Sequence, residues 1–402
     1  MKSKVLTATA AIEQALSRFL IDIISIPSLS CQERDVARRI AEEMESLGYD
    51  QVRFDGLGSV IGRIGSGPRT LVFDGHIDTV DVGNRELWDF EPYDSREVNG
   101  WIRGRGASDQ KGGVAAMVYA GKLMKDLGML EHFTVYVTGT VMEEDCDGLC
   151  WQYLVDEEGL QPDFAVITEP TDLGIYRGQR GRMEIRLTAP GVSAHGSAPE
   201  RGDNAITKMA PVVQAIDALN DHLIDDPFLG KGSVAVTEIS SLSPSLCAIP
   251  DACTLHLDRR LTWGETESSA LDELRGIMES IAGARIEVLD YDRAAYTGRT
   301  YPARKTFPAW KTDADHVLVR AAEETHRTLF DAPSRSAGRW TFSTNGVAIC
   351  GRSGIPAVGF GPGQEAMAHA PNEGIPKDHL VRAAAFYALL PRTLGYELDA
   401  TP

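Results

Sequence analysis

The chain has 402 residues, of which 40 are basic and 58 acidic, giving a net charge of −18. This charge and the lack of a Lys/Arg cluster argue against a nucleic-acid partner, and no apolar run is long enough to span a membrane. The length predicts two domains. Six cysteines without a C-x-x-C pattern predict free thiols and a cytoplasmic location. Charged side chains within residues 1–20 favour an amphipathic helix over a signal peptide.

The first part of the chain alternates helices and strands. Ser30 and Glu33 form a capping-box pattern in front of a helix. Apolar, β-branched runs predict strands at 70–75, 133–141 and 164–168, with a helix at 114–128 between the first two. This order predicts an α/β fold with a mostly parallel central sheet and helices on both faces.

A different order of elements begins near residue 180. Strands are predicted at 183–189, 233–240, 253–261 and 285–291, and helices at about 203–223 and 265–281. The order β-α-β-β-α-β is typical of a ferredoxin-like α+β domain. Helix–strand alternation then resumes, with helices from about 313 and 376 and a strand at 357–361. The sequence therefore predicts one domain formed by 1–178 and 294–402, with a second domain, 179–293, inserted into it.

Side chains that bind metals follow several predicted strands of the first domain. His76 and Asp78 lie two residues apart, so an extended backbone directs both to one side. There the pair is either structural or a metal ligand with a carboxylate that orients it. Asp109 lies among glycines just before a helix, where it either contacts a ligand or caps the helix.

Taken together, these strand-end residues form a set of metal-binding type. Ligands of an open α/β sheet gather at the carboxyl ends of its strands. The set consists of two imidazoles and three carboxylates: His76, Asp109, Glu144, Glu169 and His369. It exceeds what one tetrahedral zinc ion needs and suits two metal ions that share a bridging carboxylate.

The stretch MEEDCDG, which follows the strand at 133–141, crowds four carboxylates together. Bound cations would turn their mutual repulsion into coordination. Adjacent residues of an extended strand point to opposite sides, so a bend at 143–144 is needed if Glu143 and Glu144 face the same site. Asp147 is predicted to cap the helix that follows, and no role is assigned to Asp145.

Seven motifs occur in the order of one known family: LVFDGHIDTV, GRGASDQKGG, MEED, ITEP, GVSAHGSAP, DRRLTWGE and AHAPNE. On these motifs the chain resembles, over residues 12–392, the co-catalytic metallopeptidase/amidohydrolase family of acetylornithine deacetylase, succinyl-diaminopimelate desuccinylase, carboxypeptidase G and aminoacylase-1. The stretches SDQKGGVAAMVYAGK and EEDCDGLCWQYL point to its YgeY-like subgroup. The resemblance implies a zinc-peptidase-like catalytic domain with an inserted domain that serves as lid and dimerisation domain.

The resemblance also implies which residues bind the metals. His76 and Glu169 would bind one divalent ion, and Glu144 and His369 a second. Asp109 would bridge the two. The ions are expected to be zinc, with cobalt and manganese as alternatives. A cis peptide bond is expected between Asp109 and Gln110.

The catalytic groups follow from the same resemblance. Glu143 would act as general base toward a metal-bridging water, and Asp78 would orient His76. His195, in the inserted domain, would reach the active site of a partner subunit and stabilise the oxyanion, which requires a homodimer. Arg260 would bind a substrate carboxylate; by itself it is also compatible with a salt bridge on a strand.

Two departures from the family pattern concern substrate recognition. Cys247 stands where relatives carry an asparagine, and WTFSTNGVAI at 340–349 replaces a glycine-rich segment. We expect Thr344 and Asn345 to take over part of that segment's substrate binding.

The sequence predicts a metal-dependent hydrolase that cleaves the amide bond of a small N-acyl amino acid or related compound. A dipeptidase or carboxypeptidase acting on short peptides is the alternative, since both use the same site. A non-catalytic binding protein of the same fold is disfavoured because the base and the ligands are all present.

Overall fold

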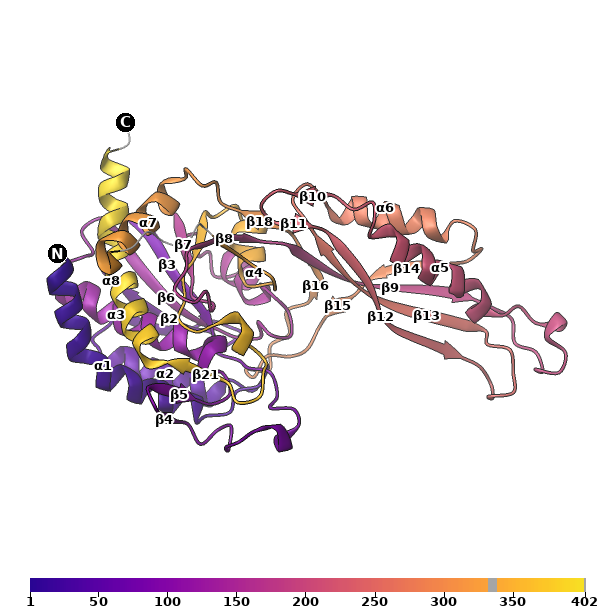
Figure 1. Cartoon of the computed structure of the whole chain (residues 1–402), viewed down its shortest axis with the longest axis horizontal. Helices are drawn as coiled ribbons and strands as arrows, with labels where there is room; N and C mark the ends of the chain where they lie inside the picture. The colour runs from indigo at the N-terminus through magenta and orange to yellow at the C-terminus, as the bar shows by residue number, and fades with distance from the viewer. Residues whose placement is uncertain (332–337, 401–402) are drawn as a thin grey trace.

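The computed structural model describes residues 1–331 and 338–400 and shows an elongated molecule with two parts (Figure 1). The larger part contains both termini and is built around a sheet of nine strands. Eight of them lie in the order β1-β2-β6-β3-β7-β20-β8-β18, and β19 pairs with β8. Their bounds are β1 Gln51–Phe54, β2 Val60–Ile64, β3 Arg69–His76, β6 Phe133–Thr140, β7 Phe164–Ile167, β8 Tyr176–Gln179, β18 Trp310–Lys311, β19 Gly338–Trp340 and β20 Ala357–Gly359.

The centre of this sheet is parallel, because β6, β3, β7 and β20 pair in the same direction. Its strands bury both faces: Leu71 and Phe73 of β3 belong to one apolar core and Val72 to another. The first core includes residues of α1 Lys2–Ile24, α2 Arg34–Ser46, α3 Gly112–Asp126, α7 Val317–Phe330 and α8 Lys377–Ala400. The second includes residues of α4 Leu149–Asp156 and η4 Val347–Arg352. The predicted α/β sheet with helices on both faces is confirmed.

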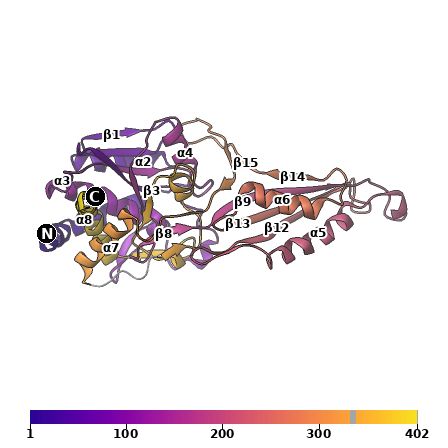
Figure 2. The same ribbon diagram turned by 90° about the horizontal axis from the view of Figure 1, so that it is seen from above.

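The smaller part is an antiparallel sheet in the order β12-β13-β9-β14, with α5 and α6 packed on one face (Figure 2). Alternate residues of β9, among them Met183, Ile185 and Leu187, are buried in its core, whereas Arg182, Glu184 and Arg186 lie on the other face. The bounds are β9 Gly181–Pro190, α5 Ala205–Leu219, β12 Ser233–Leu242, β13 Ala252–Leu261, α6 Glu267–Met278 and β14 Arg285–Val288. This is the ferredoxin-like arrangement that the order of elements predicts.

Short strands complete the structure and connect its parts. They are β4 Arg96–Val98, β5 Trp101–Arg103, β10 Asp225–Asp226, β11 Gly230–Lys231, β15 Asp290–Tyr291, β16 Ala303–Arg304, β17 Thr306–Phe307 and β21 Gly374–Pro376. β17 pairs with β9 of the smaller sheet, and β18 pairs with β8 of the larger one. The loop between β15 and β16 packs on the larger part, where Tyr296 donates a hydrogen bond to the Gly58 carbonyl.

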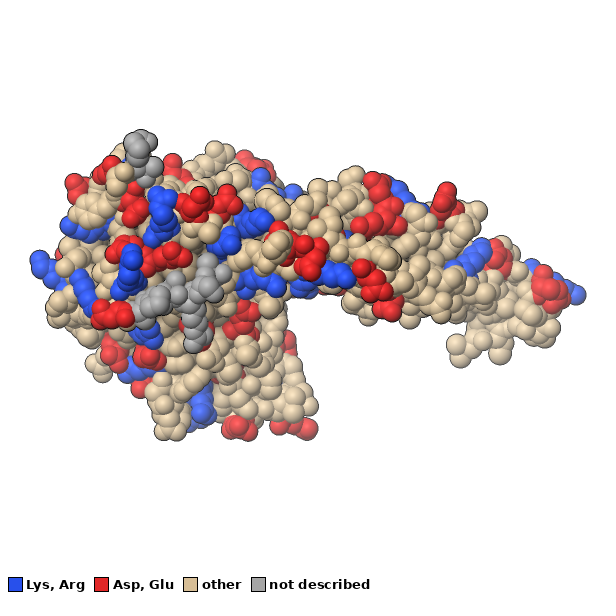
Figure 3. Space-filling model, turned by 45° about the horizontal axis from the view of Figure 1, so that its top comes forward, with Lys and Arg blue, Asp and Glu red and all other residues tan. Residues whose placement is uncertain are grey.

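None of the helices within residues 1–331 and 338–400 is both long and apolar enough to cross a bilayer. The six cysteines all lie in these ranges and are free. Acidic and basic side chains are interspersed over the face of the molecule in Figure 3, which shows a narrow waist between the two parts.

Candidate metal centre

Residues from four neighbouring strand ends meet at the carboxyl edge of the parallel sheet. His76 is the last residue of β3, and Glu143 and Glu144 follow β6. Glu169 lies just after β7, and His369 lies in the segment between β20 and β21. Asp109 lies in η2 Ala107–Lys111, immediately before α3. The structure thus brings together all five predicted ligands and the predicted base.

Asp109 lies between the two imidazoles. Its Oδ1 is 3.1 Å from Nε2 of His76, and its Oδ2 is 3.3 Å from Nε2 of His369. Each imidazole also faces a glutamate: His76 Nε2 lies 3.6 Å from Glu169 Oε1, and His369 Nε2 lies 2.9 Å from Glu144 Oε2. The His76–Glu169 pair and the His369–Glu144 pair therefore both face the carboxylate of Asp109. The Asp109–Gln110 peptide bond is cis, as expected.

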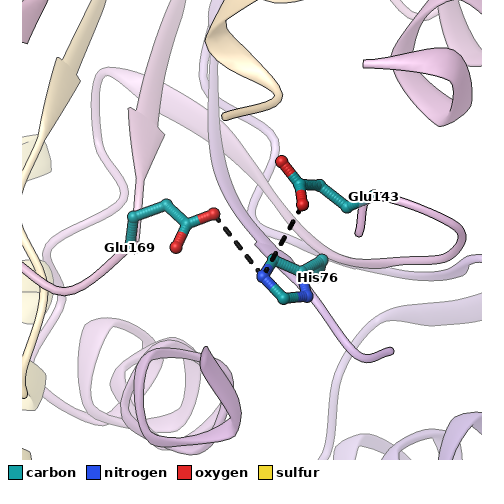
Figure 4. A group of neighbouring side chains, drawn as sticks. All are labelled: His76, Glu143 and Glu169. Carbon is teal, nitrogen blue, oxygen red and sulfur yellow. Dashed lines mark ion pairs between the residues drawn. The ribbon is translucent and has the colours of Figure 1, made fainter. Parts of the chain in front are cut away.

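Glu143 lies on the His76 side of the centre. Its Oε2 is 4.0 Å from His76 Nε2, and Figure 4 shows Glu143 and Glu169 reaching the same ring nitrogen from different directions. The other ring nitrogen, Nδ1, lies 2.9 Å from the carbonyl oxygen of Asp78. Since a carbonyl only accepts, Nδ1 carries a proton, and Nε2 is the ring nitrogen that faces the carboxylates and is placed to bind a cation.

The bend predicted at 143–144 is present. β6 ends at Thr140, Met142 adopts a left-handed conformation with φ 62°, and the N–H of Cys146 bonds to the carbonyls of Met142 and Glu143. Left-handed backbone is uncommon for a residue other than glycine. This turn, rather than an extended strand, lets both glutamates face the same site.

The centre carries an excess of buried negative charge. Burial raises the pKa values of Glu143 and Glu169 well above their usual range. Burial and the neighbouring Asp109 charge also raise the pKa of Glu144. Hydrogen bonds to Asp109 and Glu144 raise the pKa of His369 to about 10. Every one of these shifts adds a proton to the site, which is the compensation that cations would provide.

The side chains offer suitable donors for divalent cations. One oxygen each of Glu143, Glu144 and Glu169 is buried without a hydrogen-bond partner among the described residues. Two clusters, His76–Glu143–Glu169 and His76–Asp109–Glu144, have ligand atoms within 4.8 Å of one another. Carboxylate oxygens and imidazole nitrogens are donors for zinc, and carboxylates also suit manganese.

A cavity of about 360 Å³ opens onto this centre. Arg260, predicted to bind substrate, lines it together with residues to which the sequence assigned no such role: Asp147, Arg182, Phe342, Ser343 and Glu365. Asp258 binds Nε and Nη2 of Arg260 at 2.6 and 3.0 Å. Arg182 lies directly opposite Arg260 on β9. That cross-strand position follows from pairing register, which the sequence alone does not give.

Thr344 and Asn345 do not line the cavity, although they were predicted to contact substrate. The hydroxyl of Thr344 donates to Gln179 at 2.7 Å and accepts from the Gly346 N–H. The Asn345 amide donates to Asp74 and Thr140 and accepts from the Gly148 N–H and the Cys150 thiol. Both side chains are buried and engaged with the protein interior.

The two other acidic residues of the MEEDCDG stretch also have structural partners. Asp147 was predicted to cap α4, but Gly148 holds the N-cap position. Oδ2 of Asp147 lies instead 3.8 Å from Nε of Arg182. Asp145 accepts a hydrogen bond from Tyr291 and pairs with Arg293, both in the segment leading back from the smaller sheet.

His195 lies in the smaller part and is exposed, outside the cavity of its own chain. Its Nδ1 accepts hydrogen bonds from the N–H and the hydroxyl of Ser197, at 3.1 and 2.7 Å. Nε2 of the neutral ring is therefore a donor. Cys247, which replaces an asparagine of relatives, lies nearby: its carbonyl accepts from the N–H of Gly196.

Comparison with known proteins identifies the relatives of this chain. Residues 72–393 match Peptidase family M20/M25/M40. The uncharacterized protein YgeY of Escherichia coli (strain K12) is 54% identical over 377 residues, covering 94% of this chain and 93% of that protein. Succinyl-diaminopimelate desuccinylase of Magnetococcus marinus is 30% identical over 295 residues, covering 69% and 74%.

Solved structures show the same fold. The YXEP protein of Bacillus subtilis, described as a dinuclear metal-binding peptidase of the M20 family, superimposes with a TM-score of 0.71. The alignment covers 95% of this chain and 98% of that one at 16% sequence identity. At that identity the likeness shows the fold alone.

Proposed function

Because the chain belongs to peptidase family M20/M25/M40, we propose that this member is a two-metal amidohydrolase that cleaves the amide bond of a small N-acyl amino acid or a related compound. The observation that carries the proposal is the position of Asp109, whose two oxygens face two separate imidazole–glutamate groups. His76 and Glu169 would hold one ion, Glu144 and His369 the other, and Asp109 would contribute to both. The ions are zinc, with cobalt or manganese able to replace it.

The bound ions would lower the pKa of the attacking water and polarise the scissile carbonyl. Glu143 would accept a proton from the water and donate it to the leaving nitrogen. Glu143 lines the cavity beside the five ligands and is not one of them, so its carboxylate would be free to accept that proton. Glu144 serves only as a ligand, so the two adjacent glutamates have different tasks.

Arg260 binds a carboxylate of the substrate. It lines the cavity, and Asp258 holds two of its three nitrogens. No described residue is hydrogen-bonded to the third, Nη1, which is left for the substrate. This geometry supports an acyl amino acid, whose free carboxylate would lie beside the scissile amide.

The active form is a homodimer that joins through the smaller part and places His195 at the partner's metal centre. Two observations support this. β12 is an outer strand of its sheet and exposes Ile239 and Leu242. An outer strand with exposed apolar residues is a surface for pairing with a second chain. His195 presents an N–H donor on an exposed loop, which suits stabilisation of an oxyanion.

A dipeptidase or carboxypeptidase is the second candidate, because peptide and acyl-amide bonds require the same base and ions. We place the enzyme in the cytoplasm on the ground of its free cysteines. Its substrate is a small molecule rather than nucleic acid, since the chain carries a net charge of −18, which repels a polyanion.

A substrate screen tests the proposal. The protein, reconstituted with zinc, cobalt or manganese, is incubated with N-acyl amino acids, N-carbamoyl amino acids and dipeptides, and the released amine is measured. Glu143→Ala, loaded in the same way, is the control for contaminating activity. Release from an acyl amino acid but not from dipeptides supports the first candidate. Release from none of the compounds contradicts the proposed reaction class.

A further inference from the structure

A buried ion pair lies behind the second metal site. Arg105 is 2% exposed and Glu373 is 0% exposed, and Nη1 of Arg105 donates to Oε2 of Glu373 at 2.7 Å. The two residues lie just beyond the paired strands β5 and β21, where Gly374 is opposite Arg103. The N–H of Gly104 donates to the Glu373 carbonyl at 3.0 Å and extends this ladder by one bond.

The Glu373 carboxylate also holds the backbone of the Asp109 loop. Its Oε1 accepts from the N–H groups of Ser108 and Asp109, at 2.8 and 3.0 Å, and its Oε2 accepts from the N–H of Gly106 at 2.9 Å. Three backbone donors therefore converge on one carboxylate. This requires the left-handed conformation of Gly106, whose φ is 84°.

The same pair reaches the backbone of His369. Nη2 of Arg105 lies 3.4 Å from the His369 carbonyl oxygen, and the guanidinium is packed over the Trp88 ring, 5.1 Å from its centroid. A second hydrogen bond joins the Asp109 loop to the segment that carries His369, since Ser108 Oγ accepts from the Gln364 N–H at 3.0 Å. Asp109 and His369, which are 260 positions apart in the sequence, are thus fixed to one buried unit.

The other ligands are held differently. His76 is the last residue of β3 and pairs with Thr140 of β6. Glu169 directly follows Thr168, whose N–H donates to the Asp74 carbonyl at 2.9 Å. These positions are set by the parallel sheet, and neither residue contacts Arg105 or Glu373. The Arg105–Glu373 pair therefore supports the segments of Asp109 and His369 more directly than the positions of His76 and Glu169.

We propose that the Arg105–Glu373 pair is a positioning device for the second metal ion, the one assigned to Asp109, Glu144 and His369. The inference rests on the two-ion site proposed above. A purely structural role is the competing explanation, because removing one partner of a buried ion pair lowers stability in general. The two explanations differ in what they predict for each ion separately.

Glu373→Gln tests the difference, because glutamine keeps the shape and one carbonyl acceptor but removes the charge and one acceptor oxygen. Asp55→Asn is the matched control. Asp55 is also a buried carboxylate that accepts three backbone N–H groups, from Leu57, Gly58 and Ser59 at 2.9, 2.6 and 2.8 Å, and it lines no part of the cavity. All three bonds go to Oδ1 of Asp55, so Asp55→Asn removes a buried charge while keeping them. It thus controls for the loss of a buried carboxylate charge away from the metal-ligand loop.

Zinc and cobalt binding are measured by competition with a chelator, together with the visible spectrum of the cobalt forms. We expect Glu373→Gln to bind the second ion about 10- to 100-fold more weakly. The first ion should be weakened less, because it shares only Asp109 with the second. Asp55→Asn should bind both ions like the unmodified protein. An equal loss of both ions, or no loss of either, overturns the inference.

Arg105→Lys is a second variant in case Glu373→Gln does not fold. Lysine can still pair with Glu373, but it cannot also reach the His369 carbonyl through a second nitrogen. A selective weakening of the second ion is again expected, and two ions bound normally contradict the proposal. If the unmodified protein binds one ion or none, the two-ion site itself is wrong, and this outcome is distinct from the others.

Discussion

Oδ2 of Asp78 accepts a hydrogen bond from the backbone N–H of Glu144, at 3.1 Å, and Oδ1 accepts one from the N–H of Glu143 at 3.2 Å. The carbonyl of the same residue binds Nδ1 of His76. Asp78 was predicted to orient His76, and its carboxylate lies 3.5 Å from Nδ1 while it also holds the turn after β6. It thereby links the end of β3 to both glutamates.

Substitution of the two adjacent glutamates should give different defects. Glu143→Ala should retain both metal ions and lose activity by at least about 100-fold, because it removes the proton acceptor. Glu144→Ala should lose metal as well as activity. Metal content is measured by elemental analysis after dialysis, and amine release by the assay above. A Glu143→Ala enzyme with unchanged kcat would contradict the assignment of the base.

Catalysis by His195 in a partner subunit predicts complementation. His195→Ala and Glu143→Ala should each be inactive alone. A mixture that exchanges subunits should regain activity, since a hybrid dimer contains one site with both residues intact, roughly a quarter of the sites in a random mixture. Subunit exchange is verified by mass spectrometry of differently tagged chains. Exchange without recovered activity would show that His195 does not act across the interface.

Asn345→Ala should lower stability rather than substrate affinity. The variant removes the hydrogen bonds that Asn345 makes to Oδ2 of the buried Asp74 and to the Gly148 N–H, which should cost about 3 kcal/mol of unfolding free energy. Ser343→Ala is the matched comparison: Ser343 lines the cavity, so this variant should change KM and not stability. Denaturant unfolding and kinetics are measured on both. An Asn345→Ala protein of normal stability with a raised KM would restore the predicted role in substrate binding.

Glu33→Gln should become relatively more stable as the pH rises. Burial and the Asp78 charge raise the pKa of Glu33 from 4.5 to about 8. Between these values the folded protein keeps a proton that the unfolded chain has released, so the unfolding free energy of the unmodified protein falls with rising pH. Glutamine does not titrate. The stability of Glu33→Gln relative to the unmodified protein should therefore increase by roughly 3.5 kcal/mol from pH 5 to pH 8.

The control for this experiment is Glu45→Gln, at an exposed position of α2. Its stability relative to the unmodified protein should not change over the same range. Unfolding by denaturant at pH 5, 6.5 and 8 gives both differences. Equal pH dependence of the Glu33→Gln and unmodified proteins would show that Glu33 is ionised in the folded state.

The sequence predicted the parts of the structure that depend on local pattern. Strand ends followed by His76, Glu144 and Glu169 could be placed because a buried strand has a recognisable composition and ligands gather at its carboxyl end. The bend after β6 followed from alternation: two adjacent residues cannot face one site from an extended chain.

Contacts between distant segments could not be predicted. Ser30 and Glu33 form a capping-box pattern, but Ser30 donates to Asp78, and Glu33 accepts from the N–H groups of Cys31 and Met142. The helix α2 begins without a side-chain cap. Asn345 likewise serves a buried carboxylate of β3. In each case a group from another part of the chain competes successfully with the local partner.

The connection between the two parts of the molecule has a mechanical consequence. The chain passes from β8 to β9 at Arg180 and returns from β17 to β18 at 308–309, and these passages pair side by side as one two-stranded ribbon. The ribbon is tightly apposed, since a Cβ atom on Gly181 would come within 2.3 Å of the Phe307 carbonyl. Bending within its plane would stretch hydrogen bonds, whereas bending across it changes only backbone torsions. Any swing of the smaller part therefore bends both strands of the ribbon together, and it also changes the contacts of the loop between β15 and β16 with the larger part.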